Sequence, residues 1–183
     1  MIIIVHGPPA SGKSTLAEKL SAQLDLPHIS RDKITEWLME AGKIDSDGFF
    51  KFIGNAGYEL MFNVAEELSK GRGDFIVEGS LNPEGSRKRF EAILGNRASE
   101  VLEVFLSAPN EVLVERYHSR TLGSDRHLAH NDTEKVKRIG QHLKEVHYRP
   151  MGFAGLLEID GTEPKEAIFT KVAEAIQQAS TEI

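Results

Sequence analysis

A short apolar segment at the N-terminus leads through a glycine-rich turn into a segment with helical periodicity. Residues 2–5 are all β-branched and apolar, which is typical of a central strand in a parallel sheet covered on both faces. Between Lys13 and Leu24, leucines recur at helical spacing with charged and polar residues between them, and this pattern predicts an amphipathic helix. A buried strand that feeds directly into a helix begins a β/α unit, so we expect a fold built around a parallel sheet.

The turn between this strand and helix matches the pattern G-x-x-x-x-G-K-[ST] in full. Its glycines let successive backbone N–H groups and the positive end of the helix dipole approach phosphate oxygens without obstruction by side chains. The lysine is expected to reach the β- and γ-phosphates, and the serine hydroxyl to ligate Mg²⁺. The sequence therefore predicts binding of a nucleoside triphosphate. The residues predicted to bind it here are Gly7, Pro8, Pro9, Ala10, Ser11, Gly12, Lys13, Ser14 and Thr15.

Strand-like and helix-like segments alternate along the rest of the chain, and we find no internal repeat or linker. This alternation predicts a three-layer α/β fold with a mainly parallel sheet, formed by a single domain over residues 1–183. In such sheets, ligands bind beyond the carboxyl ends of the strands. Further strands are expected at 27–29, 75–78, 101–106 and 156–159. Further helices are expected at 31–41, 47–71, 83–94, from 109 to about 120, at 133–147 and at 165–179.

The long helix expected over residues 47–71 is rich in apolar side chains at helical spacing, which predicts a face directed to the core. Phe49, Phe50 and Phe52 could instead line a pocket for an acceptor, but aromatic residues at this spacing are more often core residues, so we favour the core. The residues expected on the core face are Phe49, Ile53, Ala56, Leu60, Val64 and Leu68.

Composition and charge narrow the possible partners and the compartment. The chain has 22 Lys and Arg against 28 Asp and Glu, a formal net charge of −6, so binding to nucleic acid would need a local basic patch. Cysteine is absent, which fits a reducing compartment and predicts a cytoplasmic protein. No apolar stretch is long enough to span a bilayer, so no membrane partner is expected.

Residues 121–131 are polar and lack a steady period, which is typical of a mobile lid over an active site. Arg126 lies inside this segment and could neutralise charge on a transferred phosphoryl group when the lid closes. A solvated arginine is an equally good interpretation of Arg126.

Three further motifs resemble a known family. Ser30-Arg31-Asp32 follows the second expected strand, residues 78–84 (EGSLNPE) follow the third, and Arg116 and Arg120 precede the lid. Together with the phosphate-binding turn, they are similar to P-loop kinases of the polynucleotide 5′-hydroxyl kinase type and their small-molecule kinase and zeta-toxin-like relatives. The resemblance implies a P-loop NTPase fold with a five-stranded sheet of order 2-3-1-4-5 and a helical lid. It also implies Mg-ATP as the phosphate donor and a hydroxyl as the acceptor.

The resemblance also assigns roles to individual residues. It makes Asp32 the general base for the attacking hydroxyl, although an aspartate at this position could simply cap the following helix. It makes Glu78 an acid that organises Mg²⁺ through water; the family's nucleic-acid kinases have aspartate there, and the alternative is a surface carboxylate at the end of a strand. Arg116 and Arg120, four residues apart and hence on one helix face, would contact ATP phosphates or stack on adenine.

The leading interpretation is a kinase that transfers the γ-phosphate of ATP to a hydroxyl of a small molecule. A polynucleotide 5′-hydroxyl kinase is less expected because Thr35 stands where the nucleic-acid enzymes carry an arginine, although Lys33 could compensate. A nucleotide-dependent switch ATPase without an acceptor is the third possibility. The segment from His127 to Asp132 has a His-x-x-His-x-Asp pattern found in some relatives, and it assigns no role. The sequence does not define the oligomeric state.

Overall fold

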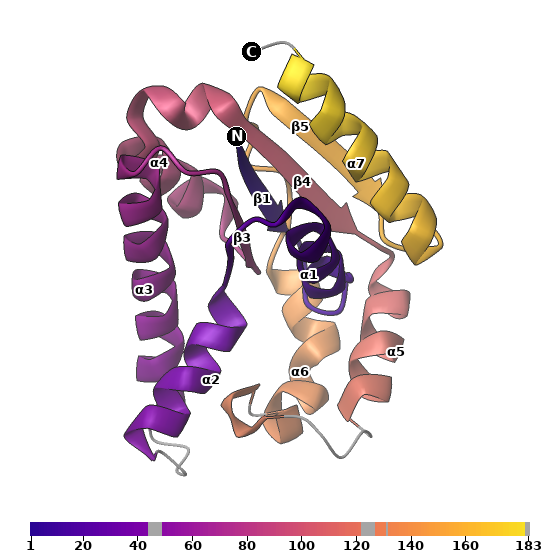
Figure 1. The fold of residues 1–183 in the computed structure, drawn as a ribbon. Helices are drawn as coiled ribbons and strands as arrows, with labels where there is room; N and C mark the ends of the chain where they lie inside the picture. The colour runs from indigo at the N-terminus through magenta and orange to yellow at the C-terminus, as the bar shows by residue number, and fades with distance from the viewer. Residues whose placement is uncertain (44–48, 122–126, 131, 182–183) are drawn as a thin grey trace.

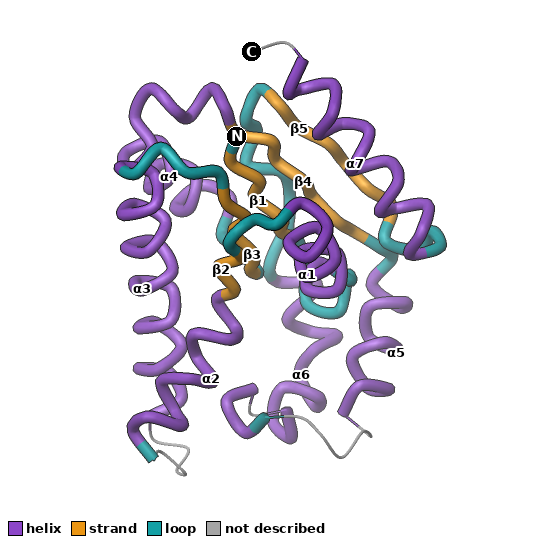
Figure 2. Tube along the Cα trace, viewed as in Figure 1, coloured by secondary structure: helices purple, strands orange, loops and turns teal. Residues whose placement is uncertain are grey.

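A computed structural model of the chain describes residues 1–43, 49–121, 127–130 and 132–181. Five parallel strands form one sheet in the order β2-β3-β1-β4-β5 (Figures 1 and 2), which confirms the order that the family resemblance implies. β1 is central, so both of its edges are hydrogen-bonded, as its apolar sequence predicts. The strands are β1 (Ile2–His6), β2 (His28–Ser30), β3 (Phe75–Gly79), β4 (Val101–Ser107) and β5 (Gly155–Asp160).

Helices cover both faces of the sheet (Figure 2), which confirms the three-layer architecture. The α-helices are α1 (Lys13–Leu24), α2 (Arg31–Gly42), α3 (Phe50–Lys70), α4 (Pro83–Leu94), α5 (Asn110–Thr121), α6 (Asp132–Glu145) and α7 (Lys165–Thr181). The described residues also include the short 3₁₀ helices η2 (Gly95–Glu100) and η3 (Leu128–His130). Of the helices in the described ranges, none is both long enough and apolar enough to cross a membrane.

Two buried clusters fill the space between the layers, because successive side chains of β1 point to opposite faces of the sheet. α3 and α4 cover one face, whose cluster includes Ile2, Ile4, Met61 and Phe90. α1 and α7 cover the other, whose cluster includes Ile3, Val5, Leu20 and Val172. A third cluster joins α5 and α6 beneath Ala10 of the glycine-rich turn. The carboxyl end of β1 is therefore covered by helices on both faces of the sheet.

The buried face of α3 differs from the predicted one. Ile53 is buried as expected, but Leu60 and Val64 are 39% and 42% exposed. The stripe that faces α2 and the sheet instead runs through Ile53, Gly57, Met61 and Ala65. Gly57 explains the rotation, because a Cβ there would lie 2.5 Å from Thr35 Oγ1 of α2. The two helices approach most closely at a residue that has no side chain, which an apolar periodicity does not reveal.

The prediction that the phenylalanines at the start of this helix are core residues was wrong for two of them. Phe49 and Phe52 are 55% and 67% exposed, and neither lines a cavity described below. Phe50 is half-buried against Met39 and Ile53. The start of the helix expected at Asp47 lies outside the described residues, and the helix that is described begins at Phe50.

Candidate active site

The glycine-rich turn between β1 and α1 wraps around the amino end of α1. Gly7 and Gly12 have φ values of 149° and 101°, in the left-handed region that favours glycine. At Gly7 a Cβ would lie 2.0 Å from the carbonyl oxygen of Leu106, so only glycine fits against β4. The Ser11 hydroxyl is buried and has no hydrogen-bond partner among the described residues. An anion held by this turn would supply the missing partner.

Lys13 lies at the start of α1 and is only 6% exposed. Its Nζ donates a hydrogen bond to the carbonyl oxygen of Pro8, 3.2 Å away, across the mouth of the turn. Burial lowers the pKa of this ammonium, while the nearby carboxylates of Glu78 and Asp32 oppose the shift. Lys13 therefore lies where the negative charge of a phosphate group bound by the turn would stabilise its ammonium form.

Glu78 occupies the carboxyl end of β3, beside Val5 of β1 and Ser30 of β2. The alternative of a surface carboxylate is wrong, because Glu78 has no exposed surface. Ser14 Oγ donates to Oε1 over 3.1 Å and Ser30 Oγ donates to Oε2 over 3.0 Å. Burial raises the pKa of Glu78 and the neighbouring Asp32 adds to the shift, whereas Lys13 and the two hydroxyl groups lower it. A carboxylate buried beside a serine hydroxyl is a donor set that suits Mg²⁺, since that ion prefers oxygen ligands.

Asp32 lies in the first turn of α2 and does not cap the helix. The cap is Ser30, whose hydroxyl oxygen accepts a bond from the Lys33 N–H over 3.4 Å. Arg31 Nη1 donates to Asp32 Oδ1 over 2.8 Å, and the same guanidinium lies 4.6 Å from the ring centroid of Tyr58. Burial on its own would raise the pKa of Asp32, but Arg31, Lys13 and His130 outweigh it and hold the pKa below its ordinary value. The carboxylate is therefore ionised at neutral pH.

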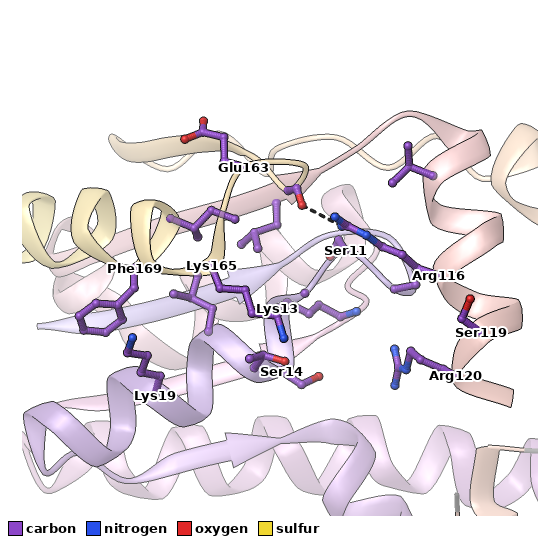
Figure 3. Close-up of a pocket in the computed structure, with 18 of the residues that line it drawn as sticks. Ser11, Lys13, Ser14, Lys19, Arg116, Ser119, Arg120, Glu163, Lys165 and Phe169 are labelled. Carbon is purple, nitrogen blue, oxygen red and sulfur yellow. Dashed lines mark hydrogen bonds between the residues drawn. The ribbon is translucent and has the colours of Figure 1, made fainter. Parts of the chain in front are cut away.

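A cavity of about 620 Å³ lies on the α7 side of the turn (Figure 3). Besides residues 10–16, it is lined by Arg116 and Arg120 of α5 and by Phe169 of α7. Arg116 Nη1 donates to the carbonyl oxygen of Gly161 over 2.8 Å, the bond that is dashed in the close-up. Both arginines of the predicted pair therefore face the space beside the glycine-rich turn.

Gly161 was not among the predicted site residues, although the sequence shows its Asp-Gly-Thr turn. A Cβ there would lie 2.8 Å from the Ser11 carbonyl oxygen and 3.0 Å from that of Ser107. The turn after β5 is thus pressed against the glycine-rich turn and forms part of the cavity wall. The available signal was a glycine-containing turn at the carboxyl end of a parallel strand, where ligands bind.

A second cavity, of about 490 Å³, lies on the α2 side of the same turn. It shares Ala10, Lys13, Ser14 and Arg120 with the first cavity, so the two meet at the end of the glycine-rich turn. Asp32 lines this second cavity. The lining residues that the sequence did not single out carry no local pattern that distinguishes them from other helix or loop residues; they are Tyr58, Tyr117, Arg138, Ile139, His142 and Tyr148.

Part of the predicted lid is docked on α2. His130 Nε2 lies 2.7 Å from Glu36 Oε1, and His127 Nε2 lies 3.6 Å from Glu40 Oε1. Ala129 between them is buried against α2 and α3 residues. Arg126 lies outside the described residues.

Lys33, the residue weighed as a phosphate-binding substitute, forms an ion pair with Glu18 over 3.0 Å and lines neither of these two cavities. Thr35 donates its hydroxyl hydrogen bond to the carbonyl oxygen of Arg31 over 2.9 Å, within its own helix. Neither side chain is placed to hold a phosphate of an acceptor.

A parallel sheet of order 2-3-1-4-5 with this glycine-rich turn after its central strand defines the class of P-loop proteins with the kinase fold. Within that class, the chain belongs to the AAA domain family, whose pattern matches residues 2–145.

Sequence relatives include an adenylate kinase from Kosmotoga olearia, 34% identical over 128 residues, covering 66% of this chain and 59% of that protein. A cytidylate kinase from Methanopyrus kandleri is 28% identical over 121 residues, covering 66% and 62% of the two chains. The chain thus spans about three fifths of the length of these relatives.

Two solved structures share the fold over nearly the whole chain. One from Chloroflexus aurantiacus has a TM-score of 0.78 and 22% identity, covering 95% of this chain and 97% of that one. A gluconokinase from Sinorhizobium meliloti has a TM-score of 0.63 and 19% identity, covering 98% and 93% of the two chains. At such identities the likeness concerns the fold. The predicted relation to polynucleotide kinases stays a prediction.

Proposed function

We propose that the protein is a kinase that transfers the γ-phosphate of ATP to a hydroxyl group of a small molecule. The observation that carries the proposal is the position of Asp32, an ionised carboxylate in a cavity that meets the phosphate-binding cavity at Lys13 and Ser14. ATP would occupy the cavity beside α7, and the acceptor would occupy the cavity beside α2.

The proposal gives each group at the junction a task. Backbone N–H groups of the turn and the Lys13 ammonium would hold the triphosphate, and Arg116 and Arg120 would contact its phosphates or the adenine. Ser14 and Glu78 would hold Mg²⁺, directly or through water, and the ion would neutralise charge on the β- and γ-phosphates. Arg126 would add positive charge to the transferred group; its role rests on its place in the sequence.

A hydroxyl acceptor needs a base, and this requirement favours it over a phosphate acceptor. An alcohol holds its proton almost as tightly as water does, whereas the second pKa of a phosphate monoester is only about 6. As the acceptor oxygen bonds to the γ-phosphorus, the bond from that phosphorus to the β,γ-bridging oxygen breaks and ADP leaves. The hydroxyl proton passes to Asp32. A phosphate acceptor would already be ionised and would leave Asp32 without this task.

A phosphate acceptor is nevertheless a second candidate, because the relatives described above are adenylate and cytidylate kinases. Positive side chains in the acceptor cavity, such as Arg120 and Arg138, would suit a nucleoside monophosphate. The two candidates differ in what is formed: a phosphate ester in one case and a phosphoanhydride in the other.

Substitution of Asp32 separates these functions. Asp32→Asn is expected to lower kcat for a hydroxyl acceptor by about 10²- to 10⁴-fold, since it removes the base, and to leave the KM for ATP unchanged. Lys13→Ala is expected to abolish ATP binding or turnover. Asp25→Asn is a matched control, because Asp25 is exposed at the end of α1 and lines neither of the two cavities.

The acceptors to compare are sugars, nucleosides, aminoglycosides, nucleoside monophosphates and a 5′-hydroxyl oligonucleotide, with products identified by ³¹P NMR. Formation of nucleoside diphosphates at a rate that Asp32→Asn leaves unchanged would favour the phosphate acceptor. Labelling of the oligonucleotide alone would support the polynucleotide kinase. ATP hydrolysis that needs Lys13 but not Asp32, with no acceptor labelled, would support the switch ATPase.

A further inference from the structure

The two walls of the acceptor cavity differ in charge. α2 contributes Asp32, the only carboxylate among the described residues that line the cavity, together with Arg31, which forms an ion pair with it. α6 contributes Arg138 and His142, which are four residues apart and therefore lie on one face of that helix. α2 and α6 are separate helices on different sides of the molecule (Figure 1), and residues of both line the cavity, so a bound molecule would meet both kinds of group.

Most of the other positive charges around this cavity already have a role. Lys13 belongs to the phosphate-binding turn. Arg31 donates to Asp32 and to the Gly54 carbonyl oxygen, 3.3 Å from its Nη2. His130 pairs with Glu36. Arg138, by contrast, makes no ion pair within the described ranges. Among the described residues, the positive charge that Arg138 brings to the α6 wall therefore has no ion-pair partner.

The packing of α6 fixes where this charge lies. Ile139, next to Arg138, is buried with Leu143 against Tyr117 of α5, which sets the rotation of α6. His142 Nε2 and the Tyr148 hydroxyl are hydrogen-bonded over 3.0 Å. Burial raises the pKa of Tyr148 to about 12, so its phenol remains a neutral donor or acceptor. Arg138 and this His–Tyr pair therefore form a polar wall on the α6 side of the cavity, which Tyr58 and Tyr117 also line.

We propose that the α6 wall is a subsite for an anionic group of the acceptor, a carboxylate or a phosphate monoester. The group binds to the Arg138 guanidinium, whose parallel N–H donors match two oxygens of either anion, and it contacts the His142–Tyr148 pair. The acceptor is thus a small hydroxyl compound whose anionic group binds at α6 while its hydroxyl is at Asp32. This inference rests on the proposed function and defines its substrate class.

The test compares matched acceptors with and without an anion: gluconate with sorbitol, glucose 6-phosphate with glucose, and glycerol 3-phosphate with glycerol. In every pair of which the enzyme phosphorylates at least one member, we expect the anionic member to have the higher kcat/KM. Preference for gluconate alone would indicate carboxylate binding, and preference for the phosphate esters would indicate phosphate binding.

Arg138→Gln is expected to raise the KM for the anionic acceptor by about 10- to 100-fold, as loss of a charged hydrogen bond does, and to leave the KM for ATP unchanged. Arg138→Lys should restore part of the affinity, because it keeps the charge and loses the paired geometry. Lys144→Gln is the matched control, since Lys144 is an exposed cation of the same helix that does not line this cavity.

Equal use of neutral and anionic acceptors, with no effect of Arg138→Gln, would overturn the subsite and leave the hydroxyl kinase intact. If no hydroxyl compound accepts phosphate and nucleoside monophosphates are converted to diphosphates, the proposed function fails and the subsite fails with it. ³¹P NMR distinguishes the two products, because the diphosphate shows phosphorus–phosphorus coupling and the ester does not.

Discussion

Two buried glutamates flank the central strand, one on each side, and they are held in different ways. Glu78 of β3 lies beside Val5, and Glu103 of β4 lies beside Ile4; both side chains have no exposed surface. Glu78 accepts hydrogen bonds from the hydroxyl groups of two serines. Glu103 accepts from His6 Nε2 over 2.8 Å, and from the backbone N–H groups of residues 151–153.

The groups that donate hydrogen bonds to the two carboxylates differ, and this difference separates a carboxylate with a structural role from one that can bind a ligand. A hydroxyl can rotate and can accept as well as donate, whereas a backbone N–H can only donate and is fixed in direction. The N–H groups therefore commit Glu103 to an anionic, structural role, and they connect the segment after α6 to the sheet. Ser14 and Ser30 leave the oxygens of Glu78 free to exchange a hydroxyl for a cation or water.

The pKa directions of the two groups agree with this difference. Burial raises the pKa of Glu78 and its hydroxyl partners do not compensate. Burial would also raise the pKa of Glu103, but His6 and the backbone N–H groups outweigh it and hold the pKa below its usual value. The protein's own hydrogen-bond donors thus favour the charged form of Glu103, whereas the charged form of Glu78 would gain from a bound cation.

The largest expected effect is on stability, at Glu103. Glu103→Gln should lower the free energy of unfolding by about 3–5 kcal/mol, the cost of breaking a buried charged network, because an amide NH₂ would face backbone N–H donors. Urea denaturation measures it, with Glu158→Gln on exposed β5 surface as the control. A loss below about 1 kcal/mol would remove the distinction between the two glutamates.

The next effect is on activity, at Glu78. Glu78→Gln should lower phosphate transfer at limiting Mg²⁺ by about 10- to 100-fold, as substitutions around a metal typically do, while unfolding stays within about 1 kcal/mol because the serine hydroxyls can reorient. The measurement is initial rate against Mg²⁺ concentration. If Glu78→Gln kept normal activity but lost several kcal/mol of stability, Glu78 would have the structural role that is assigned here to Glu103.

Low pH should lower the free energy of unfolding through protonation of Glu103. Its folded pKa is lowered, so its contribution to stability is present above the unfolded glutamate pKa of about 4.3 and is lost as the pH falls through the folded pKa. The loss is about 1.4 kcal/mol for each unit by which the pKa is lowered. Urea midpoints between pH 6 and pH 3 should fall more steeply for the wild type than for Glu103→Gln. Parallel curves would contradict the assignment.

The smallest effect belongs to Ser30, which caps α2 and donates to Glu78. Ser30→Ala should cost about 1 kcal/mol of stability through the lost cap. Because Ser14 remains, the Mg²⁺ dependence of activity should change little. Ser99→Ala, at an exposed serine, serves as the reference for both readouts. A shift in Mg²⁺ dependence as large as that of Glu78→Gln would show that both serines are needed to place the carboxylate.

Local sequence patterns predicted the parts of the structure that depend on local geometry. The β-branched residues 2–5 and the glycine pattern after them predicted a buried strand and a phosphate-binding turn, because chain conformation there is dictated by neighbours in sequence. The family resemblance placed Asp32 and Glu78 at the ends of neighbouring strands, where the structure also has them.

Contacts between distant segments could not be predicted in this way. The rotation of α3 depends on the approach of Gly57 to Thr35, and the position of Arg138 at the cavity on the α2 side depends on how α6 packs on α5. The exposure of Phe52 has the same origin. In each case the sequence carries an apolar or charged residue at helical spacing, and only the tertiary arrangement decides which way it faces.

The matched family pattern ends at residue 145, yet the wall of the cavity on the α7 side of the glycine-rich turn includes residues beyond it. Gly161 abuts Ser11, and Phe169 borders the same space. A protein shortened to end at residue 145 would therefore keep its glycine-rich turn but lose Gly161 and Phe169, which contact that turn or line the cavity beside it. In a variant cut back to residues 2–145, the cavity beside the glycine-rich turn would lack the wall that residues after 145 provide.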